Sequence, residues 1–160
     1  MQTHPGGAKE VKQAIRSAID YLRGQGCLKI GAVGYCRGAS HLLDLLAGDE
    51  IVAGYIAHPA GSTETQVEKV KKPLSIAAAD GDWALTDEKR KISERILKRN
   101  GSPYQINLYS HVQHGFAVRR EVVTKAEIYA KRQAFVQAVS WFEEHLVGGD
   151  EGDEPWGVRE

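Results

Sequence analysis

The residues of this sequence that are best suited to perform chemistry lie in the segment Gly-Tyr-Cys-Arg-Gly, Gly34–Gly38. A short apolar run, residues 28–33, precedes this segment, and apolar residues at helical spacing follow it. This order predicts a sharp strand-to-helix turn that holds the Cys36 thiol clear of a sheet, with a glycine on each side to prevent clashes. The start of the helix favours negative charge, which lowers a thiol pKa. The backbone N–H of Arg37 is the expected donor to an oxyanion.

An acid and a base follow this cysteine along the chain. Asp80 and Asp82 come directly after the apolar run 74–79, and His114 follows a segment of alternating hydrophobicity. Hydrolases built on an α/β sheet carry nucleophile, acid and histidine in this order, at the carboxyl ends of strands. The acid would orient the imidazole, and the imidazole would exchange a proton with Cys36.

Alternatives remain open for both the acid and the cysteine. Asp80 and Asp82 both suit the acid role, and Asp82 is favoured, although either could instead cap the next helix. Thr86 or Asp87 is the better cap candidate. Cys36 could also be an ordinary buried cysteine in a glycine-rich turn, or a redox-sensing thiol.

The other histidines have weaker expectations. His58 ends a strand and either lines the site or makes a structural hydrogen bond. His111 stands three residues before His114, but no zinc-like ligand spacing accompanies the pair, so no metal site is predicted. Three further histidines are expected at the surface: His4, His41 and His145.

Hydrophobic spacing predicts the elements that position these residues. Helices are predicted over 8–24, 40–47, 86–99 and 125–146, and strands over 28–33, 51–57, 74–79 and 104–109. The loop 60–72 is expected to be partly helical. Strands that alternate with helices indicate an α/β fold, a parallel sheet with flanking helices. The core face of the last helix is expected to hold Ile128, Phe135, Val139 and Phe142.

Composition limits the classes of partner. The 160 residues suit one domain, predicted over 1–147, with an acidic flexible tail over 148–160. The formal net charge is zero, which argues against nucleic acid. No apolar run reaches membrane-spanning length, and no secretory h-region precedes Glu10, so a cytoplasmic protein is expected. Cys27 and Cys36 are expected to be free thiols.

The chain resembles the dienelactone hydrolase family of the α/β-hydrolase superfamily, and its fungal-type members in particular. The likeness extends over nearly the whole chain. It is carried by Ile-Gly-Ala-Val-Gly-Tyr-Cys (30–36), Ala-His-Pro (57–59), Pro-Leu-Ser-Ile-Ala-Ala-Ala (73–79), His-Gly-Phe-Ala-Val-Arg (114–119) and Gln-Ala-Val-Ser-Trp-Phe (137–142).

This resemblance implies hydrolysis of a small ester or lactone through a thioester, with a dienelactone as the type substrate and without a cofactor. The implied triad is Cys36, Asp82 and His114. The oxyanion and substrate-binding residues implied beside it are Tyr35, Arg37 and His58. Arg37 departs from the family, which usually has an aromatic or apolar residue there. Its guanidinium could bind a substrate carboxylate, lower the pKa of the thiol or point to solvent.

The resemblance also implies that this sequence covers only the C-terminal part of the family's fold. The N-terminal strands that normally pair with strand 28–33 are not matched, so that strand becomes a sheet edge, which promotes aggregation. A homodimer or another partner is expected to cover it. The alternative function is therefore a catalytically degenerate homologue that serves as a structural or partner-completed subunit.

Overall fold

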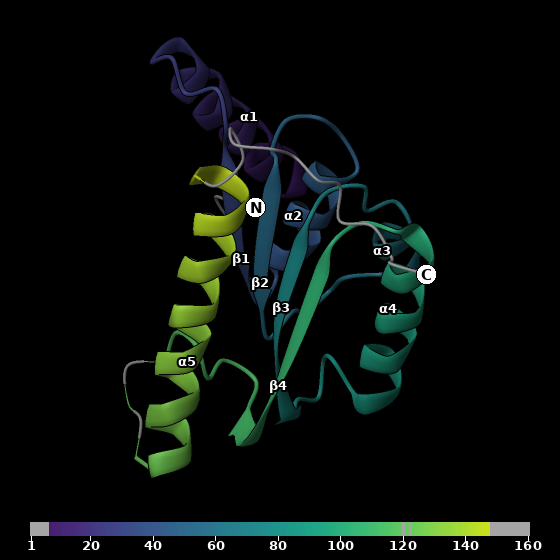
Figure 1. Cartoon of the computed structure of the whole chain (residues 1–160), viewed down its shortest axis with the longest axis vertical. Helices are drawn as coiled ribbons and strands as arrows, with labels where there is room; N and C mark the ends of the chain where they lie inside the picture. The colour runs from purple at the N-terminus through teal and green to yellow at the C-terminus, as the bar shows by residue number, and fades with distance from the viewer. Residues whose placement is uncertain (1–6, 120, 122, 148–160) are drawn as a thin grey trace, which may run out of the picture.

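The computed structural model describes residues 7–119, 121 and 123–147. Its centre is a parallel sheet with the strand order β1-β2-β3-β4 (Figure 1). The strands are β1 (Gly31–Tyr35), β2 (Ala53–Ala57), β3 (Leu74–Gly81) and β4 (Tyr104–Gln113). The helices are α1 (Ala8–Gly24), α2 (Gly38–Leu46), α3 (Glu64–Glu68), α4 (Asp87–Asn100) and α5 (Lys125–Phe142), and a π-helical turn covers Glu143–Val147. The predicted α/β fold class is confirmed.

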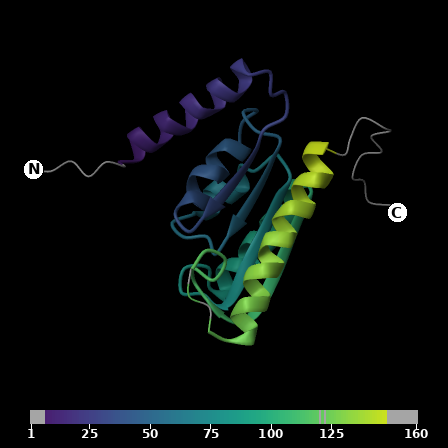
Figure 2. The same cartoon turned by 90° about the vertical axis from the view of Figure 1, so that its left-hand side faces the viewer.

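Helices cover both faces of the sheet (Figure 2). Helix α5 packs along one face, against β2, β3 and β4, while α2 packs on β1 and β2 from the other side. Successive residues of a strand point to opposite faces of the sheet and pack into different cores. Tyr55 and Ala57 belong to the α5 core, whereas Ile56 and Ile76 belong to the core under α2 and α4. The buried β2 and β3 are apolar on both faces, as central parallel strands require.

The first strand is displaced from its predicted position. Residues 28–33 were expected to form it, but β1 pairs with β2 from Gly31 to Tyr35. Leu28 is 96% exposed, so the apolar character of that residue does not reflect burial. The strand therefore continues directly into the turn, and Tyr35 is its last residue. Among the described residues, β1 pairs only with β2, which leaves its outer edge open.

The fourth strand is longer than expected. It continues to Gln113, so His111 lies in β4 and not in a loop. The pairing of β3 with β4 shifts between Ala79 and Gly81, and His111 adopts a left-handed backbone with φ 58°. This irregularity lengthens the carboxyl end of the sheet, and His114 follows it immediately.

The predicted core face of the last helix is wrong. Ile128, Phe135 and Val139 are exposed by 44%, 68% and 39%, and only Phe142 of that set is partly buried. The face that packs on the sheet is made of small residues, one glutamine and one tryptophan: Ala130, Ala134, Gln137, Ala138 and Trp141. Small side chains let the helix approach the sheet closely, so the bulkier apolar stripe of α5 points elsewhere.

Other local predictions have mixed outcomes. Thr86 is the N-cap of α4 and accepts a hydrogen bond from the Lys89 amide, so the preferred cap prediction is confirmed. His145 is half-buried against Trp141, with the ring centroids 4.2 Å apart, although it was expected to be solvated. Burial lowers its pKa. His4 and the predicted tail over 148–160 lie outside the described residues.

Candidate active site

Cys36 occupies a strained turn between β1 and α2. Its φ of 51° lies in the left-handed region, which disfavours a residue with a Cβ. Three backbone hydrogen bonds hold it there, one of which runs from the Ala39 amide to the Cys36 carbonyl at 3.2 Å. The Cys36 amide donates to the Ala57 carbonyl at 3.3 Å, and the Ala60 amide donates to the Cys36 carbonyl at 3.0 Å. The turn is thus fixed by the end of β2, by the segment that follows it and by the start of α2, and Cys36 is only half-buried.

The two glycines of the motif have different roles. A Cβ at Gly34 would lie 2.9 Å from the backbone of Gly38 and 3.0 Å from Ala39, closer than packed atoms allow. At Gly38 a Cβ would meet nothing within 4 Å. Only the first glycine is therefore required by the close approach of strand and helix. The expectation that both glycines prevent clashes is half wrong.

Three side chains from different strand ends form a hydrogen-bonded chain. His114 Nε2 lies 3.2 Å from Cys36 Sγ, and His114 Nδ1 lies 2.9 and 3.1 Å from the two carboxylate oxygens of Asp82. Asp82 and His114 are 5% and 8% exposed. With the proton assigned to Nδ1, which the carboxylate favours, Nε2 is left to accept the thiol proton. This is the arrangement of nucleophile, base and orienting acid that covalent catalysis requires.

The two candidate aspartates differ in their hydrogen-bond partners. Asp82 Oδ1 also accepts hydrogen bonds from the amides of Ala84 and Leu85, at 2.7 and 3.3 Å. Asp80 is exposed and instead accepts from the His111 amide at 3.1 Å. Asp82 therefore orients His114, while Asp80 holds the irregular end of β4.

His58 lies fully buried beside this chain. Its ring contacts Tyr35, His114 and Phe116, with centroid distances of 5.9, 5.1 and 5.8 Å. Burial and the nearby His114 lower its pKa to about 4, so the ring is neutral at pH 7. Neither ring nitrogen has a hydrogen-bond partner within the described part of the chain. The expected structural hydrogen bond is thus not found there, and the ring is too buried to face a ligand directly.

Arg37 and Tyr35 flank the cysteine and remain accessible. The Arg37 side chain is exposed, and within the described residues it forms no ion pair. Arg37 is the N-cap residue directly before α2, at a helix end whose first amides have no acceptor within the helix. Tyr35 is 39% exposed and its ring lies against that of His58. Burial of part of the ring raises the pKa of the Tyr35 hydroxyl.

One neighbour of the site was missed by the sequence reasoning. The Trp83 ring centroid lies 5.1 Å from that of His114, and 73% of the residue is exposed. The available signal was its position directly after Asp82, in a turn at a strand end. Such turns carry ligand contacts in α/β proteins.

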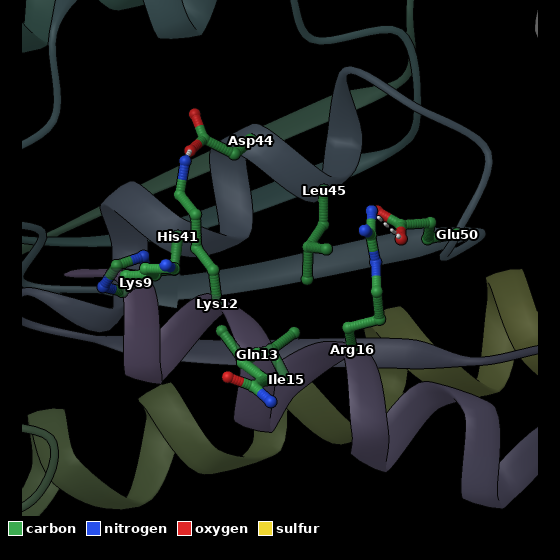
Figure 3. A pocket seen from close by; sticks show the side chains of 9 residues that line it. All are labelled: Lys9, Lys12, Gln13, Ile15, Arg16, His41, Asp44, Leu45 and Glu50. Carbon is green, nitrogen blue, oxygen red and sulfur yellow. Dashed lines mark ion pairs between the residues drawn. The ribbon is translucent and has the colours of Figure 1, made fainter. Parts of the chain in front are cut away.

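A separate cleft lies between α1 and α2, with a volume of about 390 Å³ (Figure 3). Its basic residues Lys12 and Arg16 form ion pairs with Asp44 and Glu50. His41, expected at the surface, is half-buried in its wall. None of the three hydrogen-bonded side chains described above lines this cleft.

The described residues contain no group of three or more histidine, cysteine or acidic side chains able to hold a metal ion. No helix within the described ranges is both long enough and apolar enough to cross a membrane.

Comparisons with known proteins identify the family of the chain. The sequence model of the dienelactone hydrolase family matches residues 1–146. Hydrolase tropI of Talaromyces stipitatus is 42% identical over 148 residues, which is 89% of this chain and 58% of that protein. Dienlactone hydrolase 1 of Gibberella moniliformis is 34% identical, over 74% of this chain and 46% of that protein. The chain thus spans about half the length of these curated relatives.

Solved structures share the fold at lower sequence identity. The uncomplexed acylaminoacyl peptidase of Pyrococcus horikoshii superposes with a TM-score of 0.72 at 18% identity. The match covers 89% of this chain and 29% of the peptidase. At this identity the likeness concerns the fold alone.

Proposed function

This chain belongs to the dienelactone hydrolase family, and we propose that it hydrolyses a small ester or lactone with Cys36 as nucleophile, His114 as base and Asp82 as orienting acid. The observation that carries the proposal is the continuous hydrogen-bonded chain from the Asp82 carboxylate through His114 to the Cys36 thiol. We also propose a cytoplasmic location, because a reducing compartment would keep this nucleophile a free thiol.

In the first half of the reaction, His114 Nε2 takes the proton of the Cys36 thiol. Sγ then attacks the carbonyl carbon of the ester, and the Arg37 amide donates to the oxyanion that forms. When the carbon–oxygen bond of the leaving group breaks, the departing oxygen takes the proton from His114. The product of this half is a thioester on Cys36 and a free alcohol. For a lactone, the alcohol stays on the acyl group.

In the second half, water attacks the thioester and His114 Nε2 takes its proton. The carbon–sulfur bond breaks, the carboxylic acid leaves, and the sulfur regains a proton from His114. Through both halves, Asp82 accepts the Nδ1–H hydrogen bond and stabilises the imidazolium each time it forms. The buried position of Asp82 strengthens this interaction, since little water competes for the carboxylate.

A burst experiment tests this proposal. We expect activated acetate esters to release one equivalent of alcohol rapidly and then to turn over slowly, with the acetyl group detectable on Cys36 by mass spectrometry. The Cys36→Ala variant should show neither the burst nor the acyl adduct. Equal rates for the two proteins, with both folded by circular dichroism, would exclude Cys36 as the nucleophile.

A second candidate function is a partner-completed subunit in which a second copy of this chain covers β1. Its supporting observation is an apolar surface beside the open strand edge. Val33 of β1 is 48% exposed, and Phe135 and Val139 of α5 are exposed as well. Phe142 of α5 packs directly over Gly31, which joins the helix stripe to the strand. Two copies related by a twofold axis would bury both edges.

The oligomeric state distinguishes this candidate from an autonomous enzyme. Light scattering should give the mass of a dimer, and Val33→Lys should shift it to a monomer. Leu108→Lys, at an equally exposed residue of β4, is the matched control and should leave the dimer intact. An active monomer at micromolar concentration would contradict the second candidate.

A further inference from the structure

Trp83 is an exposed aromatic residue in direct contact with the base of the site. Its indole is 73% exposed and lies 5.1 Å from the His114 ring between centroids, at an interplanar angle of 43°. Three other aromatic residues of the described chain are at least 63% exposed, and all three lie on helices: Tyr21, Tyr129 and Phe135. Trp83 alone among these four stands between the orienting acid and the helix that follows it.

The backbone around Trp83 is held firmly on both sides. Asp82 Oδ1 accepts from the amides of Ala84 and Leu85, which closes a tight turn over residue 83. Leu85 is 7% exposed and belongs to the core under α2 and α4. Thr86 then caps α4. The indole therefore projects from a fixed turn, and its exposure does not come from a loosely held loop.

An exposed tryptophan at this place leaves a large apolar face in water. Covering such a face with a flat ligand removes apolar surface from water and adds ring stacking. The accessible Cys36 thiol and the exposed part of Tyr35 lie at the same carboxyl edge of the sheet, at the end of β1, which β2 separates from the strand that precedes Trp83. A ligand whose carbonyl carbon reaches Sγ thus has an aromatic residue available next to His114.

We propose that Trp83 is a substrate-binding residue that stacks against an aromatic or other flat apolar group adjacent to the scissile carbonyl. This assignment rests on the hydrolase function proposed above and adds a selection among substrates to it. Substrates with a flat group gain the stacking contact, while saturated substrates of similar size do not. The selectivity resides in one side chain and is separable from the hydrogen-bonded chain that performs the chemistry.

Two esters of similar size test the selection: ethyl cinnamate and ethyl 3-cyclohexylpropanoate. Hydrolysis is monitored through the release of acid, so that no aromatic leaving group is needed. In Trp83→Ala we expect kcat/KM for the cinnamate to fall about 10-fold, mainly through KM, and for the saturated ester to fall less than about 3-fold. Trp83→Phe should restore most of the loss. Tyr21→Ala, at a similarly exposed aromatic residue of α1, should change neither. Equal losses for both esters, or no loss, would overturn the proposal.

A binding measurement separates this proposal from the hydrolase function. Calorimetric titration of the Cys36→Ala variant with cinnamate needs no turnover. When Trp83→Ala is combined with Cys36→Ala, cinnamate binding should weaken about 5-fold or more. The 3-cyclohexylpropanoate should bind equally to the Cys36→Ala variant and to this double variant. If neither ester is hydrolysed but cinnamate binding depends on Trp83, the hydrolase function fails and the Trp83 contact stands. If cinnamate does not bind, or binds independently of Trp83, the contact is refuted.

Discussion

Cys36 Sγ and His114 Nε2 lie 3.2 Å apart although 78 residues separate them in the chain. Topology explains the approach. All the strands run parallel, so their carboxyl ends share one edge of the sheet. Cys36 follows β1, Asp82 follows β3 and His114 follows β4. The long ends of β3 and β4 carry Asp82 and His114 far enough to meet the turn that holds Cys36.

Replacement of Asp82, the proposed orienting acid, should impair the proposed base His114 without removing it. We expect Asp82→Asn to lower kcat by about 10²–10⁴, because the amide favours the wrong tautomer of His114. Asp80→Asn is the matched control, since Asp80 accepts from the His111 amide and an asparagine oxygen can still accept. Its rate should stay within about 3-fold of the wild type. Steady-state kinetics on one activated ester compares them, and equal losses in the two variants would refute the assignment of Asp82.

The two glycines of the turn provide a paired test of backbone geometry. Gly34→Ala should destabilise the fold by about 1–3 kcal/mol and reduce thiol reactivity, because its Cβ would collide with the backbone of Gly38 and Ala39. Gly38→Ala should change stability by about 0.5 kcal/mol or less, since its Cβ enters open space. Urea denaturation with iodoacetamide labelling of Cys36 measures both effects. A costly Gly38→Ala with a tolerated Gly34→Ala would contradict this geometry.

His58 should make stability depend on pH. Its pKa falls from 6.5 in the unfolded chain to about 4 in the folded protein, so the unfolded chain binds more protons between these values. The stability that the neutral ring contributes is complete above pH 6.5 and is lost as pH falls towards 4. Between pH 7 and pH 5 we expect the wild type to lose about 2 kcal/mol more than His58→Phe.

Urea denaturation at the two pH values measures this difference directly. The phenylalanine ring fills a similar volume and removes two nitrogens that have no partner among the described residues, so stability at pH 7 should be retained. Parallel losses in the wild type and in His58→Phe would show that His58 is not the group that titrates.

The buried polar contacts between α5 and the sheet should contribute more to stability than the exposed apolar residues of α5. Gln137 is 6% exposed; it accepts from the Tyr109 hydroxyl at 2.9 Å and donates to Ser75 Oγ at 2.8 Å. Gln137→Leu should therefore cost about 1–3 kcal/mol, because buried hydroxyls lose their partner. Phe135→Gln, at an exposed position of the same helix, should cost about 0.5 kcal/mol or less. Thermal unfolding of the monomer ranks the two, and the reverse order would show that α5 packs through its larger residues.

Much of this protein could be predicted from local patterns. The alternation of apolar strands and helices determined the α/β class, and the boundaries of α1 were predicted to the residue. The elbow motif around Cys36, followed by an acid and a histidine at strand ends, determined which side chains to compare. These features depend on residues that are close together in the chain, so spacing and turn chemistry are sufficient to predict them.

Tertiary structure decided the contacts that the spacing of residues along the chain does not determine. The sequence favoured Asp82 but left Asp80 open as the acid, and in the folded chain the turn over Ala84 and Leu85 directs Asp82 to His114. The packed face of α5 was mispredicted because several faces of that helix carry apolar residues, and close approach to the sheet selected the smallest. The position of Trp83 after Asp82 was visible in the sequence, but its contact with His114 was not predicted, because that contact joins two turns that meet only when the strands are aligned. Long-range contacts of this kind are a property of the folded sheet, since no local pattern specifies which strand ends become neighbours.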